Sequence, residues 1–221
     1  MADRCLLYYI TDRTQFRGNE GARRRSLLAK IAQAATAGVD YIQLREKDLS
    51  ARELQTLAEE ALGGVHDRAP LRTRLLINSR SDIAMAIGAD GVHLRSDDIA
   101  ACEARAFWTQ ALARSPQPIT RSPLLAVSCH TVADVFRAEA EDADFTVFAP
   151  VFGKHNAPGT QPAGLAALRE ACRVKIPVLA LGGVTIENAA SCLEAGAAGV
   201  AGIRLFQENK IEDVVRALRA L

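Results

Sequence analysis

Three polar side chains alternate along one short stretch of the chain, at Gln43, Arg45 and Lys47. Alternate residues of an extended strand end point to the same side, so these three side chains can converge on a single anion. Two cations and an amide suit a pyrophosphate. The alternative interpretation is a solvated Arg-Glu-Lys-Asp surface held by local ion pairs, which contribute little to stability.

Glycines follow two apolar runs near the end of the chain. Gly182 and Gly183 come after PVLAL, and Gly202 comes after AAGV. Because glycine has no Cβ, its backbone N–H can be approached closely by a phosphate. Each glycine taken alone is equally well explained by a tight turn, but their joint placement favours a phosphate site.

Candidate groups for proton transfer are few. His130 can serve as a general base or acid, and nearby Ser128 can donate to a phosphate oxygen. His93 lies inside an apolar run, so we expect a hydrogen-bonded structural imidazole there. The histidines and the five scattered cysteines lack metal-ligand or redox spacing, which favours reduced thiols in a cytoplasm.

Eight short apolar runs alternate with longer amphipathic stretches, a pattern typical of parallel strands alternating with helices. The predicted strands are residues 6–10, 41–44, 75–78, 91–94, 124–128, 145–148, 178–181 and 199–201. Eight such units favour a single (β/α)₈ TIM barrel over residues 1–221, of the α/β class, rather than an open doubly wound sheet. Active sites of this fold lie at the carboxyl ends of the strands, where the residues named above fall.

Two helices are predicted with particular clarity. Apolar residues at three- and four-residue spacings mark one over residues 27–35. Another begins after Ser50, an N-cap with Glu53 three residues on, and is predicted to end at Gly63 and Gly64.

Composition excludes several classes of function. Twenty-seven basic and 26 acidic residues give a net charge of +1, so no global field would attract nucleic acid or an anionic membrane. The sequence has neither a secretory cleavage pattern nor an apolar run of membrane-spanning length. The oligomeric state is left open, a homo-oligomer included.

Eight segments together resemble the thiamine-phosphate synthase family, which includes the TenI-type thiazole tautomerases. They are YYITDR, YIQLREK, LLINSR, GADGVHL, AVSCHT, DFTVFAPVF, PVLALGGV and AGAAGVAGI, in family order over nearly the whole chain. The resemblance implies that hydroxymethylpyrimidine pyrophosphate loses pyrophosphate and is captured by the ring nitrogen of a thiazole phosphate. The product is thiamine phosphate.

The resemblance also implies a role for each matching position. Gln43, Arg45 and Lys47 would hold the pyrophosphate, Asn78 the pyrimidine, Asp98 the cofactor Mg²⁺, Ser128 a phosphate oxygen, and Gly183 with the Gly202 and Ile203 backbone the thiazole phosphate. Arg204 stands where the synthases commonly have serine. Electrostatic stabilisation of the leaving group by cations and Mg²⁺ explains why no activated serine or cysteine is needed.

Three positions depart from the synthase pattern. Ser79 replaces an aspartate that would bind Mg²⁺, and Arg95 and Ser96 replace a Gly-Gln pair. The loop 153–162 is also altered, and Lys154 there is a poor match to the usual lysine. Asp98, either alone or together with Asp97, could still hold a Mg²⁺ that also binds substrate phosphates.

Two alternatives to a synthase follow from these departures. Thiazole tautomerases lack the same carboxylate and have a histidine where His130 stands, and they shift a proton on a thiazole carboxylate phosphate. The full set of Gln43, Arg45, Lys47 and Asp98 favours the synthase, since a tautomerase has no evident use for it. A catalytically silent barrel that binds phosphorylated precursors is the third interpretation.

Overall fold

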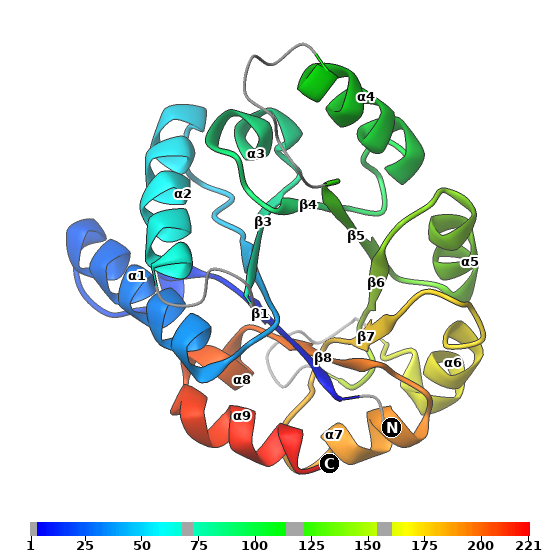
Figure 1. Ribbon diagram of the computed structural model, residues 1–221. Helices are drawn as coiled ribbons and strands as arrows, with labels where there is room; N and C mark the ends of the chain where they lie inside the picture. The colour runs from blue at the N-terminus through cyan, green and yellow to red at the C-terminus, as the bar shows by residue number, and fades with distance from the viewer. Residues whose placement is uncertain (1–3, 68–72, 114–121, 154–160) are drawn as a thin grey trace.

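Eight parallel strands close into a barrel in the computed structural model, which describes residues 4–67, 73–113, 122–153 and 161–221 (Figure 1). The strands are β1 (Leu6–Ile10), β2 (Tyr41–Leu44), β3 (Arg74–Asn78), β4 (Gly91–Leu94), β5 (Leu124–Cys129), β6 (Phe145–Phe148), β7 (Val178–Ala180) and β8 (Gly199–Gly202). Each strand pairs with the next in the chain, and β8 pairs with β1. The predicted (β/α)₈ barrel is confirmed, with strand ends within one residue of those expected.

Helices surround the barrel and cover its outer surface (Figure 1). They are α1 (Glu20–Ala37), α2 (Ala51–His66), α3 (Ser81–Ile87), α4 (Ala101–Ala113), α5 (Val132–Ala140), α6 (Gly164–Ala171), α7 (Ala189–Glu194), α8 (Arg204–Gln207) and α9 (Ile211–Arg219). A short 3₁₀ turn, Arg13–Gln15, follows β1. Within the described residues, no helix is long and apolar enough to cross a membrane.

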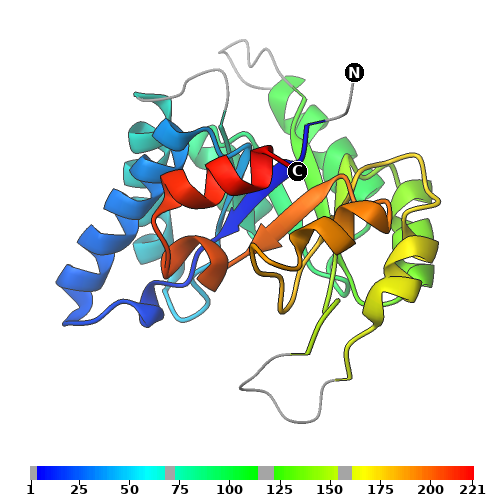
Figure 2. The same ribbon diagram turned by 90° about the horizontal axis from the view of Figure 1, so that it is seen from below.

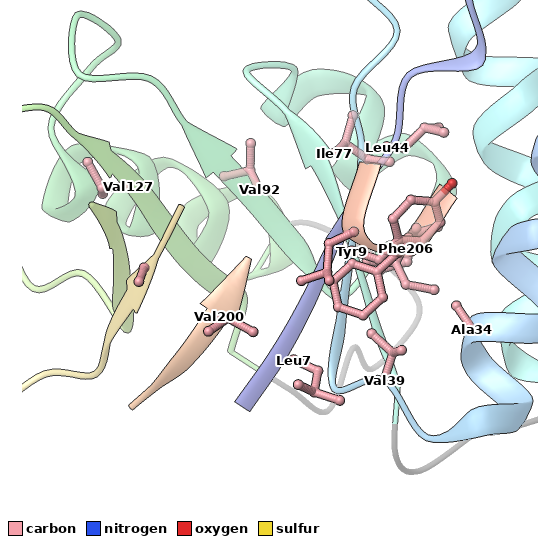
Figure 3. Packing of buried hydrophobic residues seen from close by; sticks show 14 of the residues in the cluster. Leu7, Tyr9, Ala34, Val39, Leu44, Ile77, Val92, Val127, Val200 and Phe206 are labelled. Atoms are coloured by element: carbon pink, nitrogen blue, oxygen red, sulfur yellow. The ribbon is translucent and has the colours of Figure 1, made fainter. Parts of the chain in front are cut away.

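Each strand divides its side chains between two hydrophobic layers. On β1, Leu7 and Tyr9 point outward to the helices, while Tyr8 and Ile10 point into the barrel. The outer layer is the larger, and Figure 3 shows part of it, with Leu7 and Tyr9 among the labelled side chains. Because both faces of every strand are buried, the strands read as continuous apolar runs, which is why the sequence revealed them.

The interior layer closes the barrel below the strand ends. Tyr41 stacks on Phe145 with ring centroids 4.7 Å apart, and Tyr8 packs edge-on against both rings. This aromatic floor fills the barrel, so a ligand has room only at one of its ends. In Figure 2 the arrowheads of β1 and β8 point to the same end of the barrel, as parallel pairing requires.

One predicted helix boundary was wrong. The capping box between Ser50 and Glu53 is present as expected, but α2 continues through Gly63 and Gly64 to His66. The reason is packing, because Val65, beyond the two glycines, is fully buried in the outer layer. Burial of that side chain outweighs the roughly 1 kcal/mol helix penalty of a glycine.

Candidate active site

A cavity of about 1110 Å³ opens at the carboxyl ends of the strands. The predicted site residues that line it are Gln43, Arg45, Lys47, Asn78, Ser128, His130, Gly183, Gly202 and Ile203. They come from β2, β3, β5, β7 and β8 or from the loops that follow these strands. Two predicted residues are not among them: Asp98 lies behind the cavity wall, and Lys154, with most of the 153–162 loop, lies outside the described residues.

Arg45 and Lys47 face the cavity because the residue between them is turned the other way. Glu46 is buried and accepts hydrogen bonds from the Thr11 hydroxyl at 2.6 Å and from the backbone N–H and guanidinium of Arg13. Thr11 Oγ1 in turn accepts from the backbone N–H of Arg45 at 3.0 Å. The alternation predicted from an extended strand therefore persists after β2 has ended.

Arg13 is the central residue of the network that holds Glu46, and this network anchors the 45–48 stretch. It is 4% exposed, and besides Glu46 it binds Asp48 through both Nη atoms at 2.6 and 2.9 Å and Glu20 through Nε at 2.6 Å. Burial raises the pKa of Glu46, against the opposing effect of the hydrogen bonds from Thr11 and Arg13. The two acidic residues of the 45–48 stretch, Glu46 and Asp48, thus both pair with Arg13.

Gln43 contributes a buried donor. The residue is 1% exposed, and its amide, which interacts with the Tyr8 phenol, has a nitrogen that makes no well-aligned hydrogen bond within the described part of the chain. Leaving such a donor unpaired is costly, so a cavity ligand that accepts from it would remove that cost. This observation fits an anion held between Gln43 and the two cations that follow it.

Ser128 is held by a polar chain that runs across the barrel. The Tyr8 hydroxyl lies 3.0 Å from His93 Nδ1, and His93 Nε2 lies 2.7 Å from Ser128 Oγ. Burial, together with the nearby charge of Arg45, lowers the pKa of His93 to about 3, so the imidazole is neutral. The expected structural role of His93 fits this geometry, and the imidazole also fixes a hydroxyl in the cavity wall.

The surroundings of Asp98 differ from those of an open metal ligand. One of its oxygens, Oδ2, accepts from the Ser79 hydroxyl and from the backbone N–H of Arg95, both at 2.7 Å. The other, Oδ1, contacts the Arg95 guanidinium at 3.2 and 3.3 Å. Nε of Arg95 also lies 3.3 Å from Asp97. Both carboxylates are therefore already paired with a cation.

Mg²⁺ does not fit this donor set as it stands. The ion requires oxygen ligands in octahedral geometry. The Arg95 guanidinium lies against Asp98 Oδ1, where the ion would have to bind, and its positive charge repels a second cation. Ser79, where the resemblance would place a carboxylate, adds only a neutral hydroxyl that is already hydrogen-bonded. Among the residues that the structure describes, no group of three His, Cys, Asp or Glu side chains could hold a metal. A requirement for Mg²⁺ stays a prediction for activity assays.

The opposite side of the cavity is built from glycine backbone. Gly182 and Gly183 have φ of +93° and +65°, and a Cβ on Gly183 would lie 2.8 Å from that of Phe152. The turn is fixed by Asn188, which donates to the Gly183 carbonyl at 2.9 Å and exchanges hydrogen bonds with Thr185. Only glycine adopts this positive φ readily and fits the space available, so these glycines are needed for the tight turn. Because they have no Cβ, a phosphate can also approach their backbone closely.

His130 presents one ring nitrogen for proton transfer. Its Nδ1–H donates to the Ala149 carbonyl at 2.9 Å, which in the neutral ring leaves Nε2 as the acceptor. The residue lies just before α5, where Asp134 accepts from its backbone N–H. A base-competent nitrogen therefore lies in the same cavity as Ser128.

Sequence reasoning missed several wall residues. Arg95 was recognised as a polar residue at a strand end but was given no binding role, and Phe152, Thr185 and Asn188 were not singled out although they line the cavity. The pattern Gly-Gly-Val-Thr followed by Asn188 was an available signal, because Thr and Asn commonly fix tight turns through side-chain hydrogen bonds.

The chain is similar to known proteins over almost its whole length. Residues 7–206 match the family model described as thiamine monophosphate synthase. A putative thiamine-phosphate synthase of Geobacter sulfurreducens is 41% identical over 97% of this chain and 93% of its own. The thiamine-phosphate synthase of Methanoculleus marisnigri is 37% identical over 96% and 93%.

Solved structures also match this chain over nearly its whole length. The thiamine phosphate pyrophosphorylase of Pyrococcus furiosus matches with a TM-score of 0.76 and 25% identity, covering 99% of this chain and 95% of its own. A 3-hexulose-6-phosphate synthase matches with a TM-score of 0.65 at 18% identity over 98% of both chains. The second likeness concerns the fold alone.

Proposed function

Because the chain belongs to the thiamine monophosphate synthase family, we propose that it joins hydroxymethylpyrimidine pyrophosphate to a thiazole phosphate. The products are thiamine phosphate and pyrophosphate. The relatives that carry the synthase name are 34–41% identical over most of the chain, which supports the transferase over other chemistry of the same fold.

One observation supports the proposal: two groups of candidate anion-binding residues line the same cavity. Arg45, Lys47 and the amide nitrogen of Gln43 lie on one side, and the glycine backbone of Gly183 and Gly202 lies on the other. A volume of about 1110 Å³ slightly exceeds the range of about 300–1,000 Å³ that is usual for single small-molecule sites, so it accommodates two substrates together.

The chemistry asks little of the protein beyond charge and position. The bond between the pyrimidine methylene carbon and the pyrophosphate oxygen breaks, and its electron pair leaves with the pyrophosphate. The thiazole nitrogen lone pair then forms the new carbon–nitrogen bond, and no proton is transferred. Arg45 and Lys47 stabilise the charge that develops on the leaving group, which is where fixed cations lower a barrier most.

The direct test is turnover by the purified chain. With both substrates present we expect thiamine phosphate, detected by chromatography, and Arg45→Gln should lower kcat/KM roughly a hundredfold or more, equivalent to about 2.7–4 kcal/mol. Arg173→Gln is the matched control, because Arg173 is exposed and pairs with Glu170 outside the cavity. Absence of thiamine phosphate with intact, folded protein would overturn the proposal.

A thiazole tautomerase is the second candidate, and the observation that favours it is His130. Its Nε2 is an acceptor in the cavity, as a proton shift on a thiazole carboxylate phosphate would require. Isomerisation of that thiazole in a chelator, without formation of thiamine phosphate, would establish this function instead. Failure of both assays would leave a barrel that binds phosphorylated ligands.

The proposal includes a reducing, cytoplasmic setting. All five cysteines are free thiols, of which Cys5, Cys129 and Cys192 are buried. Burial raises the pKa of Cys129 to about 12, which keeps this thiol protonated and unreactive.

A further inference from the structure

The loop after β4 places a cation beside Asp98, the expected metal ligand. Arg95 is the first residue after the strand, and its side chain lines the cavity together with Arg45 and Lys47. Asp98, to which it is bound, does not line the cavity and has a side chain only 16% exposed. Arg95, and not Asp98, therefore borders the cavity.

The contacts of Arg95 orient it without using all of its donors. Within the described part of the chain, Nε contacts Asp97 and Asp98, and Nη2 contacts Asp98. A guanidinium has five N–H groups in a fixed plane, so the Nη1 edge can still donate to an anion. Asp98 is itself fixed by hydrogen bonds from the Ser79 hydroxyl and the Arg95 backbone N–H. The orientation of the Arg95 side chain is therefore set by a hydrogen-bonded network.

The charges around Arg95 indicate its role. Asp97 and Asp98 place two carboxylates at this part of the cavity, and the Arg95 guanidinium contacts both. Without Arg95 these two negative charges would repel an anionic ligand, and with Arg95 one of them is offset. Pyrophosphate is a multiply charged anion, and planar bidentate donors are the side chains best matched to its oxygens.

We propose that the Arg95 guanidinium, positioned by Asp98, supplies the positive charge at the pyrophosphate that a carboxylate-held divalent cation would otherwise supply. The substrate in this inference rests on the proposed function. Binding of pyrophosphate by the free protein follows from the same geometry and requires no turnover. Affinity for pyrophosphate is therefore independent of added metal and dependent on Arg95.

The test is calorimetric titration of the full chain with inorganic pyrophosphate, in chelator and again with Mg²⁺. The unmodified protein should bind in chelator, and Arg95→Gln should weaken that binding roughly tenfold or more, as expected for loss of a hydrogen bond between charged groups. Arg95→Lys should fall between the two, because it keeps the charge and loses the planar fork. Arg173→Gln should bind like the unmodified protein.

A second variant addresses the metal directly. Combining Ser79→Asp with Arg95→Gly removes the guanidinium and adds a carboxylate beside Asp98. Ser79 has a φ of +56°, a conformation that aspartate tolerates, so the change suits the backbone. This variant should bind pyrophosphate weakly in chelator and recover affinity with Mg²⁺.

Three results overturn the inference: no pyrophosphate binding by the unmodified protein in chelator, equal affinity of folded Arg95→Gln, or a double variant indifferent to Mg²⁺. Failure of the proposed function has a different outcome. In that case pyrophosphate binds through Arg95 but the two substrates yield no thiamine phosphate. Thermal unfolding of each variant distinguishes a lost contact from a lost fold.

Discussion

At the scale of single residues, the direction of a side chain in this cavity is set by its neighbours. Arg45 and Lys47 face inward because buried Glu46 is held from behind by Thr11 and Arg13. The same principle operates at Arg95, which Asp98 orients, and at Ser128, which His93 orients. Ordered donors cost no reorganisation when charge develops on a ligand, and this is how a site without a nucleophile can still accelerate a reaction.

Glu46→Gln tests the anchor behind the two cations. The change keeps the shape of the side chain but removes the charge that Arg13 and Thr11 face, so the free energy of unfolding should fall by about 1–3 kcal/mol. Because Arg45 and Lys47 are then less fixed, KM for the pyrophosphate substrate should rise. Denaturant unfolding and steady-state kinetics measure the two effects.

The matched control is Glu60→Gln, which removes an exposed carboxylate paired with Arg24. It should change stability by no more than about 0.5 kcal/mol and leave KM unaltered. A loss of stability in Glu46→Gln with unchanged KM would mean that the anchor supports the fold and does not position the cations.

His93 makes stability depend on pH in a predictable direction. Burial lowers its pKa from 6.5 to about 3, so the unfolded chain binds a proton that the folded chain excludes over this range. The stabilisation is complete above about pH 6.5 and is lost as the pH falls toward 3. His93→Gln should flatten the decline in unfolding free energy between pH 7 and 4, measured by urea titration.

Exposed His66 offers the comparison, since it lies at the end of α2 in contact with solvent. His66→Gln should retain the pH slope of the unmodified protein. An unchanged slope in His93→Gln would show that the buried imidazole does not account for the acid sensitivity.

At the scale of elements, the sequence predicted what depends on local pattern. The eight strands were recognisable because both faces are buried, and α2 was recognisable at its start because Ser50 and Glu53 form a capping box. The end of α2 was missed because burial of Val65, a tertiary contact, decides it. Pairing of Arg95 with Asp98 was also missed, since two polar residues three apart in a loop do not predict their rotamers.

Two glycines in different elements predict opposite effects of the same change. Gly63 lies within α2, and a methyl group added to it would meet open space, so Gly63→Ala should stabilise the protein by about 0.4–1 kcal/mol. Gly183 has a φ of +65° and backbone and side-chain atoms of the β6 loop within 3 Å of its Cβ position, so Gly183→Ala should destabilise it by about 1–3 kcal/mol. Thermal unfolding measures both.

The two glycine variants should also differ in their affinity for thiazole phosphate. Gly183→Ala should also weaken binding of thiazole phosphate, whereas Gly63→Ala should leave it unchanged because α2 packs on the outer surface of the barrel. If alanine at position 183 is neutral for both stability and binding, the glycine turn is not the phosphate site.

At the scale of the whole molecule, the closed barrel brings distant segments to one mouth. The aromatic floor of Tyr8, Tyr41 and Phe145 blocks the interior, and the cavity lies at the carboxyl ends of the strands. The sequence located this mouth because polar residues and glycines follow the apolar runs. It favoured the synthase over the tautomerase through Gln43, Arg45, Lys47 and Asp98, and the relatives named as synthases agree with that order.

His130→Ala distinguishes them, because only one of the two reactions moves a proton. Capture of the pyrimidine carbon by a thiazole nitrogen needs charge stabilisation alone, so a synthase should lose far less than the ~10²–10⁴-fold that removal of a general acid or base costs. Isomerisation of a thiazole should suffer that full loss, since Nε2 of His130 is the acceptor that the Ala149 carbonyl leaves available. Both activities are measured on one preparation, with His66→Ala as the control. A hundredfold loss of thiamine phosphate formation in folded His130→Ala would contradict the mechanism without proton transfer and require the imidazole in the synthase reaction itself.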